Sequence, residues 1–131
     1  MSESVPDDRR TFNDADAVEH ARAGAEAIRA INHLTRGGPL PAPTAYEILG
    51  HLKELAQRLP QALDQLANGL TDSRLHYDLT DAPGRDPHYS IIEAGTHLGE
   101  AARRAEQLAD LLQAAQTAIS EQGYRTSDQD A

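Results

Sequence analysis

The 131-residue sequence contains no cysteine and no tryptophan, and only one methionine and one phenylalanine. Without cysteine the chain can form neither a disulfide nor a thiolate metal site, and it has no thiol nucleophile. Aromatic residues make up only 4% of the chain, so its core must be built from Leu, Ile, Val and Ala. This composition favours packed helices over a β-sandwich, which uses more aromatic and β-branched residues.

Basic residues are also scarce, 12 against 21 acidic, which gives a net charge of -9. Repulsion makes nucleic acid and anionic membrane surfaces poor partners for such a chain. No stretch approaches the length of a membrane span, and MSESVPDDRR has no apolar signal region. All basic residues except Lys53 are arginine and alanine is abundant, a composition typical of GC-rich actinobacterial genomes. The length of the chain, its lack of cysteine and its lack of an apolar signal region together predict one cytoplasmic domain.

Three helical segments are predicted, at about residues 14–35, 44–70 and 87–121, between flexible ends at 1–13 and 123–131. The first is preceded by a capping residue, Asn13 or Asp14, and stops at Gly37. The second follows the capping box Thr44-Ala-Tyr-Glu47. It ends near Gly69 or frays through Arg74. Its apolar positions alternate spacings of four and three, which predicts a coiled-coil-like seam: Ala45, Leu49, Leu52, Ala56, Leu59, Leu63, Leu66 and Leu70.

Pro60 lies inside this second segment. A proline within a helix costs about 3 kcal/mol, whereas burying Leu63, Leu66 and Leu70 contributes about 1.5–3 kcal/mol each. A fresh start with Pro60 as the first helical residue is the alternative. We predict one helix, kinked at Pro60.

The third helix begins either at Pro87 after Asp86 or at Ile91 after Ser90, where Ser90-Ile-Ile-Glu93 matches a capping box. Its heptad predicts two sets of core positions, namely Ile91, Leu98, Ala105, Leu112 and Ile119, and Ala94, Ala101, Leu108 and Ala115. The predicted fold is therefore all-α, an antiparallel three-helix bundle with coiled-coil-like seams. The third helix is longer than the first, so part of its apolar face needs a partner, either residues 71–85 or another chain. Dimerisation could complete a larger bundle, with these partner-binding residues: Leu98, Ala105, Leu108, Leu112 and Ile119.

The stretch YSIIEAGTHLGE raises one chemical hypothesis, because His97 lies four residues after Glu93 and three before Glu100. A His and two carboxylates at helical spacing could bind a metal. However, both acids fall on the outward side of the predicted seam, whereas di-metal bundles use inward-facing ligands from several helices. We therefore predict no catalytic, cofactor-binding or metal-binding residues. His97, Glu93 and Glu100 are the weak candidates for a metal site.

Two resemblances offer alternatives. An exposed His97 on a long helix of an acidic bundle is similar to phosphotransfer modules, although Glu100 stands where a cation would help to hold phosphate. Tyr124-Arg-Thr-Ser-Asp128 resembles the Tyr-x-x-x-Asp/Glu pattern that follows the helical hairpin of type VII secretion substrates. That resemblance implies export without a standard signal peptide. The same pattern also begins at Tyr77 and Tyr89, and the chain has no Trp for a Trp-x-Gly turn.

The sequence thus predicts a non-enzymatic binding or assembly protein that acts through protein–protein contacts. The expected partner is another protein or a second copy of the chain, which would form a homo-oligomer. No cofactor, nucleic acid or membrane is expected to take part. The long Leu and Ala seams, with no convergent polar site, are the basis of this hypothesis. The alternatives are the type VII-like exported protein and the His-containing phosphotransfer or metal-binding bundle.

Overall fold

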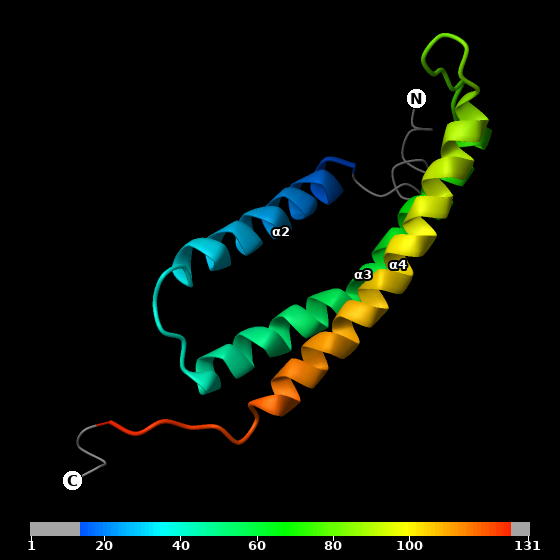
Figure 1. Cartoon of the computed structure of the whole chain (residues 1–131). Coiled ribbons are helices and arrows are strands. Elements are labelled where there is room, and N and C mark those ends of the chain that lie inside the picture. Colours follow the sequence, from blue (N-terminus) through cyan, green and yellow to red (C-terminus); the bar gives the residue numbers. More distant parts are fainter. Residues whose placement is uncertain (1–13, 127–131) are drawn as a thin grey trace, which may run out of the picture. The chain divides into compact units, whose positions relative to one another are not determined.

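A computed structural model describes residues 14–126, and the two terminal segments predicted to be flexible lie mainly outside this range. The described residues form three α-helices and no strand (Figure 1). The helices are α2 (Asp14–Leu34), α3 (Ala42–His76) and α4 (Pro87–Ala118). The predicted all-α class with three helices is confirmed. None of these helices has a stretch long and apolar enough to cross a membrane.

The chain divides into two compact units. One ends at Leu40 and contains α2, and the other begins at Pro41 and contains α3 and α4. In α2, Asp14 and Asp16 lie in the first turn, where carboxylates complement the positive end of the helix dipole. Gly37 follows the helix with φ 76°, a left-handed conformation that glycine adopts without steric cost. The predicted glycine stop is therefore present.

Helix α3 begins two residues earlier than predicted, at Ala42 after the cap Pro41. The predicted capping box is wrong, since Thr44 already lies in the first turn and the cap has no side-chain hydrogen bond. Proline is tolerated at the start of a helix because the first N–H groups have no intrahelical acceptor. The helix continues through Pro60 without a break and reaches His76.

Helix α4 begins at Pro87, the first of the two predicted starts. The Asp86 side chain caps it by accepting a hydrogen bond from the His88 N–H at 3.0 Å. The Ser90–Glu93 capping box is therefore wrong, because Ser90 already lies within the helix.

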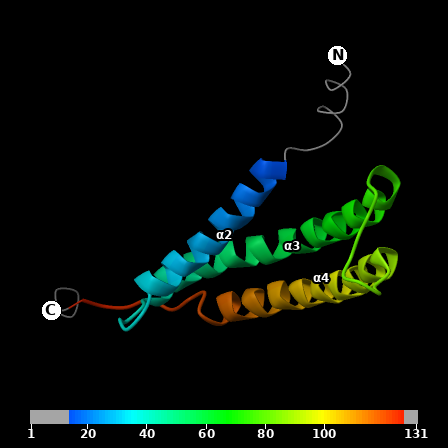
Figure 2. The ribbon, with the colours of Figure 1, turned by 90° about the horizontal axis from the view of Figure 1, so that it is seen from above.

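Helices α3 and α4 pack along their length as an antiparallel hairpin, joined by residues 77–86 (Figure 2). The buried apolar residues of this hairpin are all alanines: Ala42, Ala56, Ala102, Ala105 and Ala109. No large side chain is fully buried in the described part of the chain. The most buried positions of the hairpin are thus small residues, and leucines such as Leu52 and Leu98 are half-buried.

Candidate interaction surface

The seam residues of α4 do not follow the predicted register. One predicted set of core positions is retained, because Ala105 is buried and Leu98 and Leu112 are half-buried. The second set lies one residue further along than predicted, at Ala102, Ala109 and Gln116. Its predicted member Leu108 is 45% exposed. Alanine at the contact allows two helices to approach more closely than leucine does, so α4 turns Ala109 rather than Leu108 toward α3.

Gln116 is the one polar residue buried among the described residues, and it crosses the seam. Its Nε2 donates a hydrogen bond to the Tyr46 carbonyl oxygen at 3.0 Å. Gly50 makes room for this side chain, since a Cβ atom at position 50 would lie 3.0 Å from Gln116 Nε2. The amide therefore fits one location along α3, and a polar group that fits one location specifies helix register.

A second polar contact between α3 and α4 shows which of their residues lie opposite one another. Lys53 Nζ donates to Gln113 Oε1 at 2.6 Å. The helices are antiparallel, so two residues after Lys53 on α3 lie opposite two residues before Gln113 on α4. Leu55 is therefore level with Leu111.

Along its middle, one long side of the hairpin is slightly concave and lined mainly by polar residues, and we call this stretch the polar side. Its lining residues come from the flanks of α3 and α4 that lie together: Gln57, Pro60, Gln61, Asp64, Gln65, Glu106, Ala109 and Asp110. Successive helical residues are rotated by about 100°. On that spacing, Leu55 and Leu66 lie across the α3 seam from Gln57 and Asp64. Leu108 and Leu111 similarly lie across the α4 seam from Glu106 and Asp110.

The four leucines therefore share the opposite side of the hairpin, and we call Leu55, Leu66, Leu108 and Leu111 the leucine face. Their exposed fractions are 42%, 57%, 45% and 68%. Single exposed apolar residues are common on protein surfaces, but a set gathered on one face indicates a contact site. The leucine face is the candidate site that the structure offers.

Of the predicted partner-binding residues, only Leu108 belongs to this face. Ala105 is 5% exposed and lies in the α3–α4 seam, as do the half-buried Leu98 and Leu112. Ile119 is half-buried at the C-terminal cap of α4. The hairpin itself thus occupies most of the predicted set.

Sequence reasoning missed Leu55, Leu66 and Leu111. A signal for the first two was present, because α3 carries a second stripe in which spacings of four and three alternate: Ile48, Leu52, Leu55, Leu59, Ala62 and Leu66. Leu52, Leu59 and Leu66 also belong to the predicted seam, so one stripe concealed the other.

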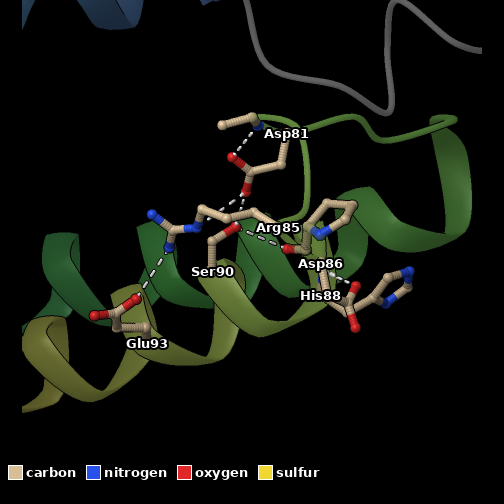
Figure 3. Close-up of polar contacts among 8 residues, drawn as sticks. Asp81, Arg85, Asp86, His88, Ser90 and Glu93 are labelled. Carbon is tan, nitrogen blue, oxygen red and sulfur yellow. Dashed lines mark hydrogen bonds and ion pairs between the residues drawn. The ribbon is translucent and has the colours of Figure 1, made fainter.

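Polar contacts tie the connection between the helices to the start of α4 (Figure 3). Ser90 Oγ donates toward Asp81 Oδ2 at 2.8 Å and lies 3.0 Å from the Pro87 carbonyl oxygen. Asp81 Oδ1 accepts from the Ala82 N–H, and Arg85 lies near Asp81 Oδ2. The pKa of Asp81 lies below its ordinary value. The hydrogen bond from the Ala82 N–H lowers it most, followed by that from the Ser90 hydroxyl and by the charge of Arg85. The cluster orders the turn.

The weak metal candidates are engaged in other contacts. Glu93 Oε1 accepts from Arg85 at 3.2 Å, and Glu100 pairs with both Arg103 and Arg104. These two pairings hold the pKa of Glu100 below its ordinary value. His97 is exposed, and residues 14–126 contain no group of three potential ligands placed to hold a metal ion.

No family model, curated protein or solved structure matches the chain. The arrangement of its residues is therefore the basis for a functional proposal.

Proposed function

We propose that this protein is a non-enzymatic binding or assembly protein that takes up α-helical protein segments on its leucine face. The observation that carries the proposal is the contrast between the two sides of one hairpin. The seam buries alanines, whereas Leu55, Leu66, Leu108 and Leu111 remain exposed on one face.

Energetics support this use of the face. Burying a methyl group contributes only about 0.8 kcal/mol, while burying a whole leucine side chain contributes about 1.5–3 kcal/mol. The hairpin therefore leaves these four leucine side chains available to a partner. A helix suits the face, because its own stripe at intervals of three and four residues matches the spacing of α3 and α4.

The test is capture on the immobilised full-length chain. We expect bound proteins to be retained by the unchanged chain and by Gln61→Asp, and to be lost from Leu111→Asp. Both positions are exposed, but Gln61 lines the polar side and Leu111 lies on the leucine face. Equal capture by all three chains would contradict the proposal.

Under this proposal the protein acts in the cytoplasm. Its acidic charge disfavours nucleic acid and anionic membrane surfaces as partners.

A second candidate function, type VII-like export, is favoured by the position of one tyrosine. Three tyrosines begin the Tyr-x-x-x-Asp/Glu pattern, but Tyr77 lies between the helices and Tyr89 lies within α4. Only Tyr124 follows the hairpin, as the secretion pattern requires. Asp128 lies outside the described residues. Export that is unchanged after Tyr124→Ala with Asp128→Ala would exclude this function.

A further inference from the structure

The leucine face is about two helices wide, which bears on what can cover it. A single helix lying along the groove between α3 and α4 would contact the side chains next to the seam, such as Leu108. Leu111 lies about 60° further round α4, and it is the most exposed of the four leucines. On α3, Leu55 is likewise rotated away from the seam. A partner that covers both of these side chains needs two helices of its own.

Charge is distributed unevenly between the two long sides of the hairpin. Asp64, Glu106 and Asp110 lie on the polar side. On the α4 flank that carries Leu108 and Leu111, the acid Glu100 is paired with Arg103 and Arg104. The α4 flank of the leucine face is therefore close to charge balance. For a chain with a net charge of -9, this is the side on which two copies can meet with the least repulsion.

From these two observations we infer that the occupant of the leucine face is the leucine face of a second copy, so that two α3–α4 hairpins form a four-helix assembly. The inference rests on the proposed function and names its partner. The second copy is a two-helix partner, and it carries the same apolar positions and the same balanced charge. A two-fold axis makes one patch complementary to itself, which is the usual arrangement of homodimers.

The experiment is mass measurement of the full-length chain by light scattering over a series of concentrations. We expect twice the single-chain mass of 14.2 kDa, and half of that value after Leu55→Asp with Leu111→Asp. Gln57→Asp with Gln61→Asp is the matched control on the polar side, and it should keep the doubled mass. Circular dichroism verifies that each variant retains its helix content.

A single-chain mass at every concentration would overturn the inference, and so would a doubled mass that survives the leucine-face substitutions. Failure of the inference can be distinguished from failure of the proposed function. If the chain is monomeric while Leu111→Asp, but not Gln61→Asp, loses its captured proteins, the face binds another protein and only self-association is wrong. If the Leu111→Asp substitution affects neither mass nor capture, both fail.

Discussion

The side-chain amide of Gln116 on α4 reaches the carbonyl oxygen of Tyr46 on α3, with 3.0 Å between Nε2 and O. It does so through the space left by Gly50, the one glycine of α3 or α4 whose added Cβ would meet a neighbouring atom within 4 Å. A buried amide that has a single matching location disfavours slipped pairings of an alanine seam, because any slip would bury it without a partner.

Gly50→Ala tests this role of Gly50. Replacing glycine by alanine inside a helix normally stabilises it by about 0.5–1 kcal/mol. At position 50 the new methyl group would disturb the Gln116 hydrogen bond, which is worth about 0.5–1.5 kcal/mol. We expect no net gain in the free energy of unfolding, measured with urea.

Gly69 provides the control, since a Cβ atom there would meet nothing within 4 Å. Gly69→Ala should show the full gain, and Gly50→Ala should regain it in a chain that also carries Gln116→Ala. Equal stabilisation by the two glycine substitutions in the unchanged background would refute the role of Gly50.

A second prediction concerns the register of α4. Ala109 is buried in the seam, whereas Ala115, a core position in the register predicted from sequence, is exposed. Overpacking a close contact costs about 1–3 kcal/mol, so Ala109→Leu should lower the free energy of unfolding by that amount. Ala115→Leu should change it little. A larger loss from Ala115→Leu would show that the predicted register is the correct one.

The sequence was sufficient to predict where the helices lie along the chain, but not which of their faces pack together. The helix near Pro60 was predictable because apolar spacing continues on both sides of it, and the Asp86-Pro87 start has recognisable cap chemistry. The register of α4 could not be predicted, since apolar residues occupy adjacent positions, Ala101 beside Ala102 and Leu108 beside Ala109. Hydrophobicity favours Leu108, whereas close helix packing favours Ala109, and only the second effect depends on three-dimensional distance.

The candidate site shows the same limit. Leu108 was predicted to contact a partner, but Leu55 and Leu111 come from different helices, and their proximity follows from the pairing set by Lys53 and Gln113. The contacts of Asp81 with Ser90 likewise depend on how the turn folds. Spacing along one helix carries no information about such pairs.

A third prediction concerns pH. The pKa of Asp81 is lowered in the folded chain, in part by the Ser90 hydroxyl. The stabilisation from its contacts is therefore complete above the ordinary aspartate pKa of about 3.9, and it is lost as the pH falls through the lower folded value. Ser90→Ala should move the Asp81 pKa upward toward the ordinary value.

Carbon-detected NMR of the Asp81 carboxyl group during acid titration measures this pKa directly. Ser120→Ala is the control, because Ser120 Oγ donates to the Thr117 carbonyl at the other end of α4, and it should leave Asp81 unchanged. An Asp81 pKa that is insensitive to Ser90→Ala would show that the hydroxyl does not stabilise the carboxylate.

A fourth prediction concerns His97. Arginines hold the neighbouring carboxylates Glu93 and Glu100, so zinc titration should show no stoichiometric site, and His97→Ala should not change the result. A site of one ion per chain that disappears in His97→Ala would revive the metal hypothesis.

We propose that the leucine face is the surface through which this protein binds others. Leu111→Asp tests it most directly, because this side chain is 68% exposed and its replacement should change the stability of the hairpin by no more than about 0.5 kcal/mol. In capture measurements with the full-length chain, we predict that Leu111→Asp loses the bound proteins while Gln61→Asp keeps them. Undiminished binding by a folded Leu111→Asp chain would show that the leucine face is not the binding surface.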